Sequence, residues 1–167
     1  MKIKELVKKG LVLGLLCLLA SMFISCGDKG NSSGDTTYYT LKYKTYIIIP
    51  AEEEVITESD ISEFTAAGFT TPGDYSISGT TITLTDEGLD KFLAVMSEEA
   101  SEESGEDIEY VYIVVYNNEL IMPLTADAYT TYGGLLEEDD DYTVDGKAIV
   151  LTQAGYEKMS PLFSSGD

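Results

Sequence analysis

Few side chains in this sequence could carry out covalent chemistry. The 167 residues include no histidine, arginine or tryptophan, and the two cysteines, Cys17 and Cys26, both lie near the N-terminus. A cysteine thiolate is a strong nucleophile. Cys26 follows the small residue Ser25 and precedes a polar stretch, whereas Cys17 follows Leu16 inside an apolar run. Cys26 is therefore the residue at which the sequence predicts a specific covalent reaction.

The residues before Cys26 have the order of an export signal. Residues 1–9 hold four lysines against one acid, and residues 11–24 form an apolar stretch of 14 residues. That stretch is short for a spanning helix, which needs roughly 20 apolar residues, and suits the core of a signal peptide. A short core helix with a buried cysteine and an uncleaved membrane anchor are the alternatives.

The segment Phe23-Ile24-Ser25-Cys26 resembles the lipobox of bacterial lipoproteins, in the looser spirochaete-like form. The resemblance implies that a diacylglyceryl group is attached to Cys26 and that a dedicated peptidase removes residues 1–25. The mature protein would then be anchored by lipid in the cell envelope, at the outer membrane, on its periplasmic face or at the surface. Two or three acyl chains make such an anchor effectively permanent.

The charge of the chain is divided unevenly. Residues 1–25 carry a net charge of +3 and the rest carry −23, within a total of −20. Such an acidic surface repels nucleic acid and anionic lipid headgroups, so nucleic-acid binding is excluded and membrane contact needs an anchor. Residues 27–35 (GDKGNSSGD) contain nothing apolar. We therefore assign residues 26–40 to the lipidated cysteine and a flexible tether.

The remainder of the chain repeats itself. Residues 74–92 (DYSISGTTITLTDEGLDKF) and 141–159 (DYTVDGKAIVLTQAGYEKM) align without gaps at an offset of 67, with eight identities in nineteen positions. Upstream the similarity is weaker: residues 46–49 match 112–115, and 57–64 match 125–132 across two small gaps. Chance resemblance between hairpins is the alternative for that upstream part. We predict a first repeat at 41–97, an acidic linker at 98–108 and a second repeat at 109–167.

Each predicted repeat has the same local pattern. Residues 43–49 and 111–116 are rich in β-branched and aromatic residues, as strands are, and Asn117-Asn118 suits a tight hairpin turn. Threonines suited to cap helices precede four segments: Thr57, Thr85, Thr125 and Thr152. The expected fold class is α+β, with two tandem ββαββα-like repeats of antiparallel hairpins and helices packed on one face. The linker region carries seven acids between residues 97 and 109, and we expect it to be exposed and mobile.

The residue types argue against catalysis. Without histidine, and with no cysteine after Cys26, there is no Ser-His-Asp triad, no thiol protease and no histidine-bound metal site. No phosphate-binding glycine loop is present either. We therefore expect a non-catalytic binding or structural module without a cofactor. Its expected partners are the membrane, through the lipid, and a protein or glycan, but not nucleic acid.

Calcium binding is the alternative function. Residues 137–146 concentrate hard oxygen ligands, with Asp139, Asp141 and Asp145 as the candidates. The stretch DYTVDG at 141–146 imitates the opening of an EF-hand loop. The twelfth position of such a loop would be Thr152 rather than glutamate, so a solvated turn is the simpler interpretation.

The twelve tyrosines have two interpretations. We expect Tyr110, Tyr112 and Tyr116 to share one strand face and to cover the core, as we expect Tyr43 and Thr45 to do. An exposed tyrosine row would instead suit recognition of a protein or glycan, because the ring buries area at low entropic cost.

Overall fold

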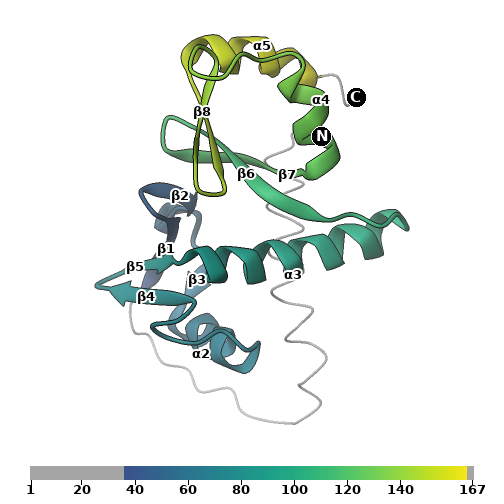
Figure 1. Cartoon of the computed structure of the whole chain (residues 1–167). Helices are drawn as coiled ribbons and strands as arrows, with labels where there is room; N and C mark the ends of the chain where they lie inside the picture. The colour runs from purple at the N-terminus through teal and green to yellow at the C-terminus, as the bar shows by residue number, and fades with distance from the viewer. Residues whose placement is uncertain (1–35, 165–167) are drawn as a thin grey trace.

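The structure is a computed structural model that describes residues 36–164, with side chains through Pro161 (Figure 1). The predicted signal peptide, Cys26 and most of the predicted tether lie outside the described residues. Across residues 36–164, no helix combines the length and the apolar character that crossing a membrane requires.

The described chain is of the α+β class, as expected. We call residues 36–104 the first half and residues 110–164 the second half. The elements of the first half are β1 (Tyr38–Tyr43), β2 (Tyr46–Ile49), the 3-10 helix η1 (Ala51–Glu53), β3 (Ile56–Thr57), α2 (Glu58–Ala66), β4 (Tyr75–Ser78), β5 (Thr81–Leu84) and α3 (Asp86–Ser104). Those of the second half are β6 (Tyr110–Tyr116), β7 (Glu119–Thr125), α4 (Ala126–Gly133), β8 (Tyr142–Asp145), β9 (Ala148–Leu151) and α5 (Gln153–Ser164).

The strands form one mixed sheet in the order β4-β5-β1-β2-β7-β6-β9-β8, with β3 paired to β1. Four antiparallel hairpins are present as expected: β1–β2, β4–β5, β6–β7 and β8–β9. Parallel pairs join them, namely β1–β5, β2–β7 and β6–β9. A parallel pair needs a crossover connection, and α2 and α4 lie within the two crossovers that lead to β5 and β9. The hairpins follow from the sequence pattern, whereas these parallel pairs between hairpins were not predicted.

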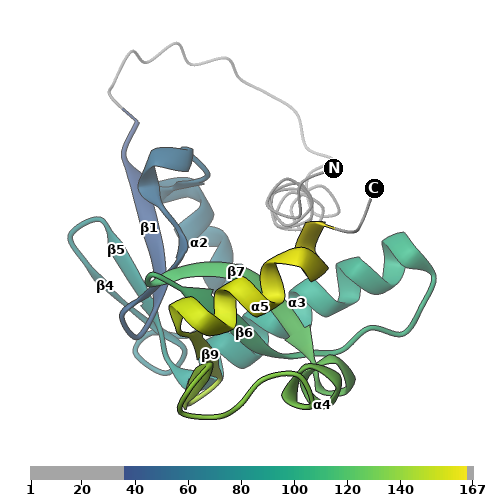
Figure 2. The same ribbon diagram turned by 90° about the horizontal axis from the view of Figure 1, so that it is seen from above.

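The helices lie on both faces of the sheet, so the predicted single helical face is wrong. Successive strand residues point to opposite faces. In β6, Ile113 and Val115 belong to the core that contains Leu89 and Phe92 of α3, whereas Val114 belongs to the core that contains Met159 of α5. Figure 1 draws α3 below β6 and β7, with α4 and α5 above them, and α5 crosses in front of β6 in Figure 2.

Two predicted boundaries differ from the structure. The first strand begins at Tyr38, so the last residues assigned to the tether belong to the sheet. The single strand predicted over residues 43–49 is divided by a turn in which Lys44 has a φ of 53°. Tyr43 therefore ends β1, and Tyr46 starts the returning strand β2.

The acidic linker predicted at residues 98–108 is mostly helix, since α3 continues to Ser104. The buried Ser97 hydroxyl donates to the Leu93 carbonyl at 2.7 Å and accepts from the Tyr110 backbone N–H at 2.8 Å, so the helix is tied to β6. Glutamate and alanine have high helix propensity, which favours this continuation despite the charge. Gly105, with a φ of 72°, then ends the helix.

The predicted asparagine turn and the predicted threonine caps are confirmed. Asn117 and Asn118 have φ values of 52° and 63°, as a tight hairpin turn of this kind requires. Thr57 forms a capping box with Asp60 at the start of α2, and Thr125 accepts from the Ala128 N–H at the start of α4. The caps of α3 and α5 belong to the framework described next.

Candidate functional site

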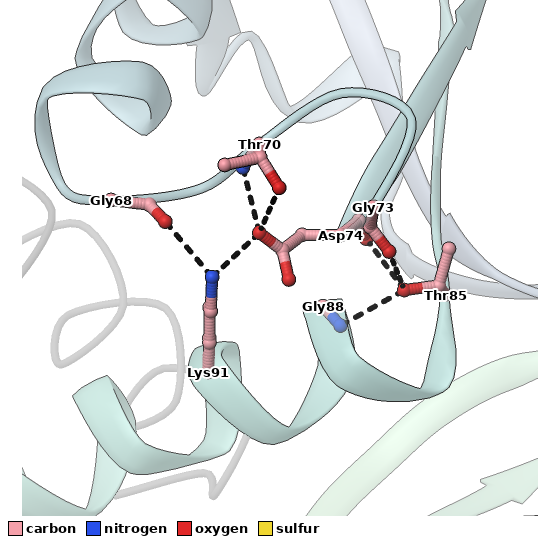
Figure 3. A network of polar contacts seen from close by, with 7 residues as sticks. All are labelled: Gly68, Thr70, Gly73, Asp74, Thr85, Gly88 and Lys91. Atoms are coloured by element: carbon pink, nitrogen blue, oxygen red, sulfur yellow. Dashed lines mark hydrogen bonds and ion pairs between the residues drawn. The ribbon is translucent and has the colours of Figure 1, made fainter.

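A buried aspartate organises the hairpin and helix of the first half (Figure 3). Asp74 is 4% exposed, and its Oδ2 accepts from Lys91 Nζ at 2.6 Å, from the Thr70 N–H at 2.7 Å and from the Thr70 hydroxyl at 2.9 Å. The hydrogen bond from Lys91, followed by the one from the Thr70 backbone, lowers the pKa of Asp74. The carboxylate therefore stays ionised at neutral pH and acts as a fixed acceptor rather than as a general acid.

Asp141 occupies the same place in the second half. It is 2% exposed, and its Oδ2 accepts from Lys158 Nζ at 2.6 Å and from the Glu137 N–H at 2.9 Å. These two hydrogen bonds lower its pKa, the one from Lys158 most strongly. The four residues Asp74, Lys91, Asp141 and Lys158 thus make two equivalent ion pairs at matching positions of the aligned sequences.

The backbone around these aspartates also matches. Thr85 accepts from the Gly88 N–H at 3.1 Å and Thr152 from the Gly155 N–H at 3.2 Å, so each threonine caps its helix. A Cβ on Gly88 would stand 1.8 Å from the Asp74 carbonyl oxygen, and one on Gly155 would stand 2.0 Å from that of Asp141. Only glycine allows each helix to lie this close to its hairpin.

A third pair of contacts joins the tip of the first hairpin of each half to the helix that follows the second hairpin. The Tyr43 hydroxyl donates to Asp86 at 2.6 Å, at the start of α3. The Tyr116 hydroxyl donates to Gln153, at the start of α5. Asp86 and Gln153 are again 67 residues apart. We call the aspartate pairs, the helix caps, the close glycines and these tyrosine contacts the shared framework.

The two halves differ in what fills the space inside this framework. In the first half, Phe64, Phe69, Tyr75 and Phe92 are all buried in one core. The ring centroids of Phe64 and Phe69 are 5.5 Å apart, and those of Phe64 and Tyr75 are 6.0 Å apart, which is typical of aromatic packing.

In the second half, the matching positions hold Tyr132, Leu136, Tyr142 and Met159. The smaller Leu136 and Met159 replace two phenylalanines, and an apolar pocket opens beneath α4. Its volume is about 10 Å³, room for about one water-sized group. The pocket is lined by Val114, Leu124, Tyr129, Tyr132, Gly133, Leu136, Tyr142, Ile149 and Met159.

Tyrosines dominate one side of this pocket, which we call the α4 pocket. The Tyr112 and Tyr129 rings pack at 4.9 Å between centroids, and both are half-buried. A hydrogen bond to Tyr129 is the main cause that raises the pKa of Tyr142, followed by burial and by the nearby Glu138. The first half has Ile61 where Tyr129 stands, so this polar edge belongs to the second half.

The rim of the α4 pocket is apolar at one point and acidic along the adjacent loop. Leu135 follows α4 and is 59% exposed. In the sequence it lies between Gly133 and Leu136, which both line the pocket. The next residues, 137–140, are two glutamates and two aspartates, all exposed. The charges of Glu137 and Asp140 raise the pKa of Lys158, although less than its hydrogen bond to Asp141 does. The Lys158 ammonium is already paired with Asp141. Most of the negative charge of residues 137–140 therefore stays uncompensated.

The structure separates the three candidate calcium ligands by their contacts. Asp141 is paired with Lys158, and Asp145 accepts from Lys44 and from the Tyr46 hydroxyl. Asp139 is exposed, with a φ of 72°. In residues 36–164, no cluster of three or more acidic, histidine or cysteine residues has a geometry that could hold a metal ion. The stretch that imitates an EF-hand opening is instead strand β8 and its turn.

The predicted tyrosine row is wrong in one respect. Tyr110 packs against the core of the first half, whereas Tyr112 and Tyr116 pack against that of the second half. The pairing of β6 with β7 shifts register between Tyr110 and Tyr112, which reverses the alternation of faces. Tyr43 is fully buried as expected, but Thr45 lies in the turn between β1 and β2.

The α4 pocket was not predicted from the sequence, although the sequence contains one signal for it. Met159 is aligned with Phe92 at the end of the repeated block, and Leu136 is aligned with Phe69 just before the block begins. The proposed lipidation residue, Cys26, lies outside the described residues. In comparisons with known proteins, no family model matches the chain, and no curated protein or solved structure matches it significantly.

Proposed function

We propose that this protein is a bacterial lipoprotein of the cell envelope that acts as a non-catalytic binding module. Its sequence supports the anchor: a lysine-rich start, an apolar run, a small residue and Cys26 follow one another in the order that lipidation requires. In this proposal a diacylglyceryl group on Cys26 holds the protein at the outer membrane, on its periplasmic face or at the surface.

The spacing between the anchor and the fold is consistent with this role. The first strand begins at Tyr38, twelve positions after Cys26. A flexible chain of that length reaches on the order of 20 Å. This distance lifts the domain away from lipid headgroups, which is favourable for a surface with so large an excess of carboxylates.

The observation that carries the binding role is the α4 pocket. In the first half, phenylalanine side chains fill the matching position. The fold can therefore accommodate larger side chains at this position. In the second half the space stays open, beside tyrosines and an exposed leucine. An apolar cavity next to aromatic side chains is the arrangement that accepts an anchoring group from a partner.

We also propose that the two halves are tandem copies of a ββαββα unit. The support is the shared framework, in which the bonds of Asp74 to the lysine ammonium and to a backbone N–H, the cap at Thr85 and the close contact of Gly88 each have a counterpart 67 residues later. The strand order adds to it, because β4-β5-β1-β2 is followed by β7-β6-β9-β8, the corresponding strands in reverse order. A twofold arrangement about the β2–β7 contact would also place the helices of the two halves on opposite faces.

The anchor is tested by mass spectrometry of the protein expressed in a bacterium, together with detergent phase partition. We expect a mature N-terminus at Cys26 carrying two or three acyl chains, and partition into the detergent phase. Cys26→Ala should abolish both, and Cys17→Ala should change neither. An unmodified Cys26 in the wild-type protein would overturn the lipoprotein assignment.

A further inference from the structure

We infer that the α4 pocket receives one apolar side chain from a basic segment of a protein partner. This inference rests on the proposed binding role and adds the chemistry of what is bound. Three observations carry it: the size of the pocket, the residues around it and the charge of its rim.

The volume of the α4 pocket favours a macromolecular partner over a small-molecule ligand. Ligand pockets that bury a small molecule usually enclose roughly 300–1,000 Å³. The α4 pocket, at about 10 Å³, has room for about one methyl-sized group. It therefore suits the tip of a single side chain whose remaining contacts lie on the surface outside.

The surface outside the pocket offers such contacts. Tyr129 and Tyr132 are half-buried, and Leu135 is 59% exposed. Tyrosine is enriched among the residues that contribute most to protein interfaces, because its ring buries much area at a low entropic cost. An exposed leucine beside an apolar pocket extends the area that a bound chain would cover.

Charge decides which kind of partner fits. Glu137, Glu138, Asp139 and Asp140 follow Leu135 directly and are all exposed. Four of the five lysines in residues 36–164 are ion-paired with aspartates, namely Lys44, Lys91, Lys147 and Lys158. The protein thus offers little positive charge of its own to the rim, and a basic partner would be drawn to it and held in register.

The first half provides an internal contrast. Its matching position is filled by Phe69 and Phe92, and the exposed residues that follow Phe69 are Thr70, Thr71, Pro72 and Gly73 rather than acids. Among the residues that the structure describes, the opening and the acidic rim therefore occur together in the second half and not at the matching position of the first, which indicates a site that the two halves do not share.

The test uses the full-length lipoprotein in neutral detergent, with its methionines labelled by ¹³C at the methyl group. The probe is a nine-residue peptide of eight lysines with a central leucine. Met159 lines the pocket, and Met96, which is buried in the core of the first half, is the matched control. We expect the peptide to shift the Met159 methyl resonance and to leave that of Met96 unchanged.

Two comparison peptides separate the contribution of the leucine side chain to binding from that of the lysine charges. Replacing the leucine by alanine should weaken binding roughly tenfold, because the buried side chain is lost. Replacing the lysines by glutamates should abolish binding. Equal binding of the leucine and alanine peptides would overturn the anchoring role of the pocket.

Two variants complete the test. Leu136→Phe should fill the pocket and weaken the leucine peptide roughly tenfold while the circular dichroism spectrum is unchanged. The quadruple change E137Q/E138Q/D139N/D140N leaves the pocket intact and should weaken both lysine peptides and reduce their salt dependence. If no lysine peptide shifts Met159, the inference fails, whereas the proposed anchor fails only if Cys26 carries no lipid.

Discussion

The two halves of the molecule share a polar framework and differ in their apolar filling. Asp74 with Lys91 and Asp141 with Lys158 form the same ion pair at the same distance of 2.6 Å. Inside this framework the first half packs three phenylalanines, and the second half leaves the α4 pocket. Hydrogen bonds and close backbone contacts therefore fix the path of the chain, while core side chains can change without altering it.

The tips of two hairpins extend the comparison. In the first half the tip is Ser78-Gly79-Thr80, which is exposed. In the second half it is Asp145-Gly146-Lys147, and these residues contact the first half: Asp145 pairs with Lys44, and Lys147 pairs with Asp90. The aspartate that imitates a calcium-loop residue is therefore part of a contact between the halves.

The largest effect is expected at the two close glycines. Gly88→Ala and Gly155→Ala each place a Cβ within 2 Å of a carbonyl oxygen, so the backbone must shift. We expect each change to lower the free energy of unfolding by about 3 kcal/mol or more, as measured by urea denaturation.

The matched control is Gly133→Ala, at the end of α4, where an added Cβ meets nothing within 4 Å. It should leave stability within about 0.5 kcal/mol of the wild type. A large loss for only one of Gly88 and Gly155 would show that the framework is not shared by the halves.

The next largest effect concerns the filled core. Phe92→Met introduces into the first half the residue that lines the pocket of the second. Phe92 is 5% exposed, so the smaller side chain should leave a cavity and lower the free energy of unfolding by about 1–3 kcal/mol. Phe69→Leu should act in the same way. Thermal and urea denaturation measure both, and no loss of stability would mean that the first half is not fully packed.

Local features of the fold could be predicted from the sequence, and long-range features could not. The caps at Thr85 and Thr152 and the turn at Asn117-Asn118 depend on residues close in sequence. The attachment of α3 to β6, by contrast, depends on a hydrogen bond from the Tyr110 backbone N–H to the Ser97 hydroxyl, thirteen residues away. The two helical faces depend on the parallel β2–β7 contact, whose register has no short-range signal.

The candidate site was even less accessible to sequence reasoning. Asp139, Asp141 and Asp145 attracted attention because charge is visible in a sequence. The α4 pocket opens because Leu136 and Met159 are smaller than the phenylalanines at the matching positions of the first half. Leucine and methionine are ordinary core residues, so neither attracts attention when the second half is considered alone. Only the comparison with Phe69 and Phe92 reveals the missing volume.

A smaller effect is expected at the contact between the hairpin tip and the first half. Asp145→Asn removes a carboxylate that accepts from Lys44 and, at 3.0 Å, from the Tyr46 hydroxyl. The lysine and aspartate side chains are 36% and 46% exposed, so the pair is well screened by solvent and salt. We expect Tm to fall by no more than a few degrees, because an exposed ion pair contributes little to stability. The fall should be smaller in high salt. Ser78→Asp, at the matching tip, should leave Tm unchanged.

The smallest effect concerns the acidic end of α3, which the second half lacks. Burial, followed by the charges of Glu103, Glu102 and Glu98, raises the pKa of Glu99 to about 7. Between its ordinary value of 4.5 and about 7, the folded protein binds more protons at this site than the unfolded chain does, so its contribution to stability falls as pH rises. Glu99→Gln should therefore raise Tm at pH 8 and change it little near pH 4.5.

Glu103→Gln is the control for this titration. It removes one neighbouring charge and leaves the burial of Glu99, the larger cause, in place. We expect a smaller rise in Tm at pH 8 than Glu99→Gln produces. An equal rise from both variants would assign the effect to the charge of the helix end as a whole.

The contrast between a filled and an open half is tested most directly by Met159→Phe, which places in the α4 pocket the residue that occupies the matching position of the first half. Urea denaturation of this variant should show a gain of about 0.5–2 kcal/mol, as is common for a side chain that fills an existing cavity. A loss of stability, from overpacking of about 1–3 kcal/mol, would show that the second half has no open space to fill.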